Sequence, residues 1–116
     1  MIHVEPICAF DRLVPGRGVA ALLADGAQVA LFRLYDDSLH AVANRDPFTG
    51  ANVLSRGLVG DRGGEPVVVS PLLKQAFSLK TGECLDDPDT ALEVYAVEVQ
   101  DGVIRVGARS EAEVAA

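Results

Sequence analysis

Few side chains in this 116-residue sequence are of the types that carry out chemistry. It has two histidines, His3 and His40, and two cysteines, Cys8 and Cys84, which form no Cys-x-x-Cys pair. His40 lies within an apolar run and is expected on a strand face, whereas His3 near the terminus is expected to be solvated. No Ser–His–Asp or Cys–His set can be assembled, because neither histidine has a supported partner. We therefore expect no catalytic residues on this chain, and two free thiols in a reducing cytosol.

One glycine-rich segment interrupts the chain between two strand-like runs. Residues 44–65 contain five glycines and Pro47, and so long a loop is uncommon in a compact domain unless it is functional. Positively charged residues gather in and after this segment: Arg45, Arg56, Arg62 and Lys74. They serve either solubility or, together with Gln75, docking to an acidic partner surface, since arginine is favoured at interfaces. Arg62-Gly63-Gly64 lacks the following helix and lysine of a phosphate-binding loop.

Short runs rich in β-branched residues indicate the elements that must position this segment. The expected strands are residues 19–24, 28–34, 39–43, 66–69, 95–100 and 103–106. Asp25-Gly26 and Asp101-Gly102 each lie between two such runs, which is the strongest short-range signal of a β-hairpin. Asp36-Asp37 and Thr81-Gly82 give weaker turn signals. These patterns predict an all-β domain over residues 1–109, followed by a frayed or briefly helical tail over residues 110–116.

Composition narrows the class of protein. Hydrophobic residues make up 49% of the chain and aromatic residues only 5%, so the core is expected to be aliphatic. The formal charge of −7 makes nucleic acid and anionic membrane surfaces poor partners. No apolar run approaches the roughly 18 residues of a membrane span, and the first residues lack the pattern of a signal peptide. These features predict a cytoplasmic protein.

Two segments carry a more specific pattern. Residues 43–51 read Ala-Asn-Arg-Asp-Pro-Phe-Thr-Gly-Ala, and residues 69–82 read Val-Ser-Pro-Leu-Leu-Lys-Gln-Ala-Phe-Ser-Leu-Lys-Thr-Gly. They resemble the two cluster-binding loops of Rieske iron–sulfur domains, roughly Asn-x-Cys-Pro-His and Cys-Pro-x-His-Gly-x-x-Phe-x-Leu-x-Thr-Gly. The residues that match the pattern are Asn44, Pro47, Pro71, Phe77, Leu79, Thr81 and Gly82. The resemblance implies a Rieske-like β-sandwich or barrel in which the two loops form a small subdomain.

The ligand positions of that pattern hold other residues. The resemblance places Asp46 and Ser70 at the cysteine positions, Phe48 and Leu73 at the histidine positions, and Lys74 at the following glycine. A Rieske cluster needs two thiolates and two imidazoles, whereas oxygen donors are poor ligands for a soft cluster and hydrocarbon side chains have no lone pair. We therefore expect no [2Fe–2S] cluster and no other metal on this chain. We also expect Phe48 and Leu73 to pack between the loops, and Asp46 to accept backbone N–H bonds in an Asx-type turn.

The similarity extends to a narrower family. Residues 46–57 and 64–77 are similar to the small subunit of assimilatory NAD(P)H-dependent nitrite reductases, as are residues 13–16, 29–32 and 82–88. That family keeps the Rieske fold without its cluster ligands. The resemblance implies an accessory subunit whose large partner carries siroheme, an iron–sulfur cluster, FAD and the NAD(P)H site, and reduces nitrite to ammonium. The alternatives are a Rieske-type ferredoxin that transfers electrons to an oxygenase, and a stand-alone β binding module.

Overall fold

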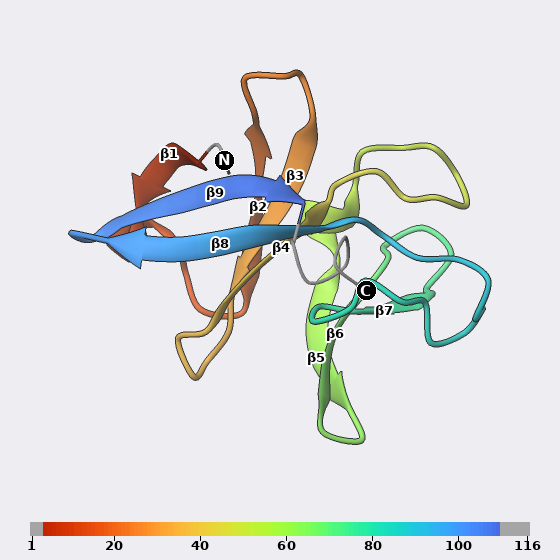
Figure 1. Cartoon of the computed structure of the whole chain (residues 1–116). Coiled ribbons are helices and arrows are strands. Elements are labelled where there is room, and N and C mark those ends of the chain that lie inside the picture. Colours follow the sequence, from red (N-terminus) through yellow and green to blue (C-terminus); the bar gives the residue numbers. More distant parts are fainter. Residues whose placement is uncertain (1–3, 110–116) are drawn as a thin grey trace.

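The computed structural model describes residues 4–109, which form two antiparallel sheets (Figure 1). The larger sheet has the strand order β1-β9-β8-β4-β3-β2, and the smaller one has the order β5-β6-β7. The strands are β1 (Val4–Ala9), β2 (Arg17–Leu22), β3 (Gln28–Arg33), β4 (Leu39–Ala43), β5 (Leu58–Arg62), β6 (Glu65–Val69), β7 (Ala76–Ser78), β8 (Val94–Gln100) and β9 (Val103–Arg109). Two short 3-10 helices are η1 (Phe10–Arg12) and η2 (Leu54–Arg56). The all-β prediction is confirmed, while the predictions for His3 and residues 110–116 fall outside the described residues.

The predicted hairpins are present in the larger sheet. Asp25-Gly26 connects β2 to β3, and Gly26 has a φ of 92°. Asp101-Gly102 connects β8 to β9 with φ values of 54° and 77°, the pair of positive φ angles that a two-residue turn of type I′ requires. Asp36 and Asp37 lie in the turn between β3 and β4. Local turn chemistry therefore fixes three of the connections between the strands of this sheet.

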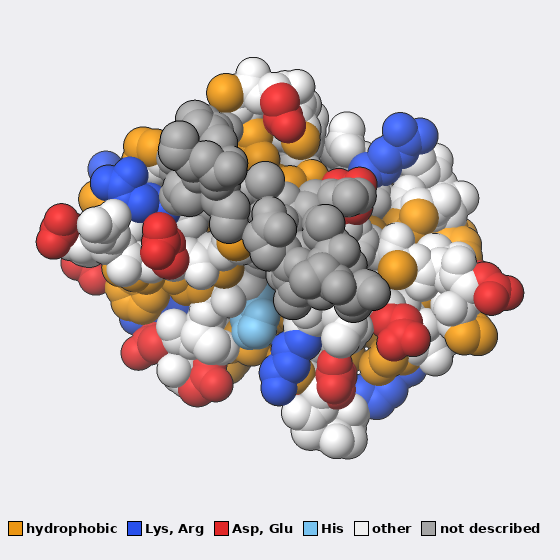
Figure 2. All heavy atoms as spheres, in the orientation of Figure 1, with side chains coloured by type: hydrophobic (Ala, Val, Ile, Leu, Met, Phe, Trp, Pro, Cys, Tyr) orange, Lys and Arg blue, Asp and Glu red, His pale blue; other side chains and the backbone are white. Residues whose placement is uncertain are grey.

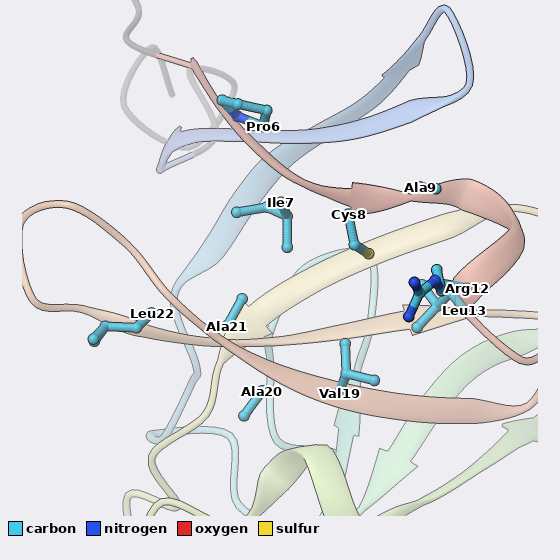
Figure 3. A pocket seen from close by; sticks show the side chains of 10 residues that line it. All are labelled: Pro6, Ile7, Cys8, Ala9, Arg12, Leu13, Val19, Ala20, Ala21 and Leu22. Carbon is cyan, nitrogen blue, oxygen red and sulfur yellow. The ribbon is translucent and has the colours of Figure 1, made fainter.

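The larger sheet curls until its two edge strands, β1 and β2, face each other without pairing (Figure 3). Between them lies a groove of about 650 Å³. A β-bulge at Ile7 interrupts the register of β1 against β9, and the side chains of both Ile7 and Cys8 point toward those of Val19 and Ala21 on β2 (Figure 3). The sheet is thus a nearly closed barrel with one open seam.

The smaller sheet corrects one prediction. Residues 44–65 were expected to be a structureless loop, but they contain η2 and the strand β5, which pairs with β6 through a turn at Gly63-Gly64. Most of β5 is exposed, with only Val59 half-buried. An exposed edge strand that contains glycine carries little of the apolar pattern by which strands are recognised.

The core has two parts because β3 is covered on both faces. Val29 and Leu31 pack inside the barrel, together with Ile104 and Val106 of β9. Ala30 and Phe32 point the other way and pack against residues of the smaller sheet and its loops: Leu54, Val68, Phe77, Leu79 and Cys84. The continuous apolar run at 29–32 is therefore that of a strand buried on both faces.

The surface is mixed in charge. Acidic and basic side chains are interspersed on the face shown in Figure 2, with the acidic ones spread around its rim. Within residues 4–109, no helix is long and apolar enough to cross a membrane.

Candidate functional site: two facing loops

The two loops singled out in the sequence extend to the same side of the molecule (Figure 1). The first loop, residues 44–53, follows β4 and closes on itself, because the Gly50 N–H donates to the Asp46 carbonyl at 2.7 Å. The second loop, residues 70–75, lies between β6 and β7 and is closed by the Ser70 N–H, which donates to the Gln75 carbonyl at 2.9 Å. The sequence pattern therefore identified segments that the fold brings together.

A buried hydrogen bond joins the two loops. The Ser70 hydroxyl donates to Oδ2 of Asp46 at 2.6 Å, and both residues are fully buried. The other carboxylate oxygen of Asp46 accepts the Phe48 N–H at 2.8 Å, which is the Asx-type turn expected from the sequence. Asp46 thus organises its own loop and anchors the opposite one.

Phe48 packs as expected and Leu73 does not. Phe48 is half-buried against the core, with its ring centroid 6.2 Å from that of Phe77. Leu73 is 54% exposed, so the expectation that it fills the space between the loops is wrong. The physical reason is the tight turn from Ser70 to Gln75, which directs both Leu72 and Leu73 to the solvent.

The backbone conformation of Lys74 keeps this turn tight. Its φ is 67°, the left-handed conformation that glycine adopts most readily. The Rieske pattern has glycine at this position, so the backbone keeps a glycine-like conformation although the residue is now lysine. Its N–H donates to the Ser70 carbonyl at 3.2 Å, and this bond helps to close the turn.

Comparison with known proteins identifies the family. The model of the Rieske-like [2Fe-2S] domain matches residues 3–107. The small subunit of NADH nitrite reductase from Salmonella typhimurium is 46% identical over 107 residues, which cover 91% of this chain and 98% of that protein. The chain belongs to the nitrite reductase small subunit family.

Further relatives extend the comparison. The solution structure of the Escherichia coli protein NirD superposes with a TM-score of 0.86 at 42% identity, covering 95% of this chain and all of that one. The large subunit of NAD(P)H nitrite reductase from Klebsiella oxytoca contains a stretch of 113 residues that is 42% identical to 93% of this chain and makes up 12% of that protein. A domain like this one therefore occurs both as a separate chain and inside a large subunit.

The residues at the four ligand positions of this chain do not fit the [2Fe–2S] cluster of the wider Rieske-like family. At the cysteine positions, the Ser70 hydroxyl donates a hydrogen bond to the Asp46 carboxylate. At the histidine positions, Phe48 packs on the core and Leu73 faces solvent, and neither has a donor atom. Among residues 4–109, no three His, Cys, Asp or Glu side chains gather where a metal could bind. This donor set is unsuited to a cluster that needs thiolates and imidazoles.

Two further polar residues, Asn44 and Asp86, form hydrogen bonds at the ends of the loops. The amide of buried Asn44, a residue of the Rieske pattern, accepts the Ser55 N–H at 2.8 Å and donates to Gln28 at 3.2 Å. Asp86 accepts the Ala76 N–H at 2.9 Å at the end of the second loop, and this bond, with a second from Arg62, holds the pKa of Asp86 below its ordinary value. Asp86 was not predicted as a site residue, because its only signal in the sequence is its place in the family-like stretch at 82–88.

The predicted interface residues occupy different environments. Arg45 and Lys74 are exposed on the first and second loops, and Gln75 is half-buried beside Lys74. Arg62 is engaged, since its guanidinium lies 3.1 Å from the Asp86 carboxylate. Arg56 is exposed at the end of η2 and lines a hollow between η2 and the start of β2. The five positions therefore differ in their exposure and in whether their charge is paired, and their role in an interface stays a prediction.

His40 lies on a strand face, as expected. It is on β4, half-buried, with Nε2 3.3 Å from the Ser38 hydroxyl. Burial lowers the pKa of His40, and a hydrogen bond with the Leu79 backbone and the charge of Asp36 partly oppose that effect. The neutral imidazole is thus favoured at a position on β4, outside the two loops.

Proposed function

We propose that this chain is the accessory small subunit of an NAD(P)H-dependent nitrite reductase and that it supports the reduction of nitrite to ammonium by a large catalytic subunit. The observation that carries the proposal is the buried hydrogen bond between Ser70 and Asp46. This bond joins the loops where a Rieske domain has two of its ligands, and it places oxygen atoms where a cluster needs thiolates. The family membership supplies the reaction and the partner.

The chemistry then belongs to the partner. From the family resemblance, we place siroheme, an iron–sulfur cluster, FAD and the NAD(P)H site on the large subunit and no cofactor on this chain. The cytoplasmic location expected from the sequence stays a prediction, which fractionation of cells followed by immunodetection checks.

The loops offer one surface for contact with the large subunit. Leu72 and Leu73 are consecutive and 48% and 54% exposed, the exposed Lys74 follows them, and Arg45 is exposed on the first loop. An apolar patch flanked by cations suits a partner surface with acidic residues around an apolar centre. The large subunit from Klebsiella oxytoca supports direct association, because it contains such a domain in its own chain.

The decisive experiment compares the large subunit with and without this chain. We expect the chain to raise nitrite turnover, the thermal midpoint of the large subunit, or both, while the purified small subunit contains neither iron nor acid-labile sulfide. A red-brown small subunit with stoichiometric iron would favour the Rieske-type ferredoxin instead. A large subunit with unchanged turnover and stability would favour a stand-alone binding module.

A further inference from the structure

The second loop is held at each of its ends by a carboxylate from another part of the chain. At its start, Asp46 accepts the Ser70 hydroxyl at 2.6 Å. At its end, Oδ2 of Asp86 accepts the N–H of Ala76, the first residue after the loop, at 2.9 Å. Ser70 and Ala76 are both fully buried. The contact of Asp46 lies at a ligand position of the Rieske pattern, whereas that of Asp86 lies outside the pattern.

The fold explains why a side chain is needed at the end of the loop. Residues 83–86 follow the outer edge of β7, and an antiparallel bridge joins this segment to the strand. The Leu85 N–H donates to the Ala76 carbonyl at 2.8 Å, so one of the two backbone groups of Ala76 has a backbone partner there. The Asp86 carboxylate accepts from the other, the N–H. Without this carboxylate, a buried donor would lose its acceptor.

A second donor fixes the Asp86 carboxylate. Nη1 of Arg62, at the end of β5, lies 3.1 Å from Oδ1, while Oδ2 accepts from Ala76. The Ala76 N–H is the larger cause of the lowered pKa of Asp86, and the bond from Arg62 comes second. Because the side chains of Arg62 and Asp86 are 50% and 42% exposed, their ion pair stabilises the fold little. The bond to Ala76 is therefore the one that matters for the loop.

The tip of the loop depends on support at its ends. Leu72 and Leu73 are exposed, and Lys74 has a φ of 67°, which is strained for a residue other than glycine. Two hydrogen bonds to Ser70 close the tip, from the Lys74 N–H at 3.2 Å and from the Leu72 N–H at 3.3 Å. A strained backbone persists where the surrounding structure fixes it. The two carboxylates thus keep both leucines turned to the solvent.

We propose that Asp86 is a positioning residue for the binding of the nitrite reductase large subunit: through the Ala76 N–H, it holds the second loop in the conformation that presents Leu72 and Leu73. The inference rests on the proposed function, in which these leucines contact the large subunit. A loop that is already held in its bound conformation loses less conformational entropy on association. Asp86 therefore raises the affinity by acting through the loop.

The test measures the affinity of the purified large subunit for variants of this chain. Asp86→Ala should weaken binding about fivefold or more, because the end of the loop is released. Asp86→Asn keeps an oxygen that accepts the Ala76 N–H, and it should stay within about twofold of the wild type. Asp89→Ala is the matched control, since Asp89 is exposed on the same stretch and, among the described residues, its side chain accepts no hydrogen bond. Thermal midpoints near that of the wild type show that the variants fold.

Two further measurements separate positioning from direct contact. In a double-mutant cycle, the effects of Asp86→Ala and Leu73→Ser on the dissociation constant should be less than multiplicative, because both act through the loop. Amide hydrogen exchange at Lys74 in the isolated chain should be faster in Asp86→Ala and unchanged in Asp89→Ala, since only the first releases the loop.

The outcomes distinguish the inference from the proposed function. No binding of the wild-type chain would overturn the proposed function itself. Wild-type binding with Asp86→Ala within about twofold of it would overturn only the role of Asp86. Equal losses in Asp86→Ala and Asp86→Asn, or multiplicative effects with Leu73→Ser, would mean that Asp86 meets the partner directly and would overturn the inference. Faster exchange throughout Asp86→Ala, without preference for the loop, would make Asp86 a residue of general stability and would also overturn it.

Discussion

At the scale of single residues, two oxygen side chains stand at the positions where a Rieske domain has thiolates. A metal–thiolate cluster holds two loops by covalent bonds, whereas Asp46 and Ser70 hold them by one buried, charge-assisted hydrogen bond of 2.6 Å. Asp46 also accepts the Phe48 N–H, and the Ser70 hydroxyl accepts the Leu72 N–H at 3.3 Å. The pair therefore fixes the backbone of both loops from a position without access to water.

The first prediction concerns this bond. Ser70→Ala should lower the free energy of unfolding by about 1–3 kcal/mol, because the buried Asp46 carboxylate loses a donor and the Leu72 N–H loses an acceptor. Urea denaturation measures the change. Ser55→Ala is the control, since the structure gives only its backbone N–H a partner, and it should stay within about 0.5 kcal/mol of the wild type. Equal stability of Ser70→Ala and the wild type would mean that the bond does not hold the loops.

The sequence predicted the part of this site that depends on contacts between residues close together in the chain. The Asx-type turn at Asp46 involves residues two apart, so residue types alone indicate it. The bond from Ser70 joins residues 24 apart and has no local signal. The exposure of Leu73 was predicted wrongly because apolar residues are normally expected inside, whereas the left-handed backbone at Lys74 turns this one outward.

His40 gives the second prediction. Its pKa is lower in the folded chain than in the unfolded one, because burial disfavours the imidazolium. The unfolded chain therefore binds more protons below the ordinary histidine pKa of about 6.5, and stability should fall as pH falls through that value toward the folded pKa.

Thermal midpoints between pH 7.5 and pH 5 check this pH dependence. His40→Gln should flatten the pH dependence of the midpoint, because the group that takes up the proton is gone. His3→Gln serves as the control with the same loss of an imidazole. A slope that is equally steep in His40→Gln and the wild type would assign the pH dependence to other groups.

At the scale of elements, turn chemistry predicts more of this fold than strand patterning does. Asp25-Gly26 and Asp101-Gly102 located two hairpins because Gly26, Asp101 and Gly102 have positive φ angles, which favour those residue types, and Asp25 accepts the Ala27 N–H within its turn. β1 was not predicted, since it contains Pro6 and a bulge at Ile7 that break the alternation of a regular strand. β5 was missed because its outward side chains leave no apolar face.

The third prediction tests the close packing of η2 against the smaller sheet. Gly57 has a φ of −72°, which suits any residue, but a Cβ there would meet Val68 at 2.8 Å and the Leu54 carbonyl oxygen at 3.1 Å. Gly57→Ala should therefore lower the free energy of unfolding by about 1–3 kcal/mol through overpacking.

Gly60→Ala is the matched control for this substitution. Nothing lies within 4 Å of a Cβ at Gly60, and its φ is outside the left-handed region. Alanine there should leave stability unchanged or raise it by less than about 1 kcal/mol, because it restricts the unfolded chain. Urea denaturation of both variants makes the comparison, and equal stabilities would contradict the packing argument.

At the scale of the whole molecule, the two sheets share one core, and that core supports the loops proposed to contact a partner. The two-part core around β3 joins the barrel to the smaller sheet, so both loops are held on one framework. A large subunit that contacts both loops would be bound to this framework at two points. Such a contact would restrain the large subunit without contributing any group to the reaction.

The fourth prediction is the composition of the complex. In Klebsiella oxytoca a stretch of 113 residues similar to this chain forms 12% of one large subunit, so each such chain carries its own copy. A separate chain that occupies the same place should bind one copy for each large subunit. Native mass spectrometry of the complex, titrated with excess small subunit, measures the ratio. Saturation at one copy per large subunit is expected, since the Klebsiella oxytoca large subunit contains one stretch similar to this chain. Saturation at two copies, or at one copy for two large subunits, would mean that the separate chain assembles differently from the tethered domain.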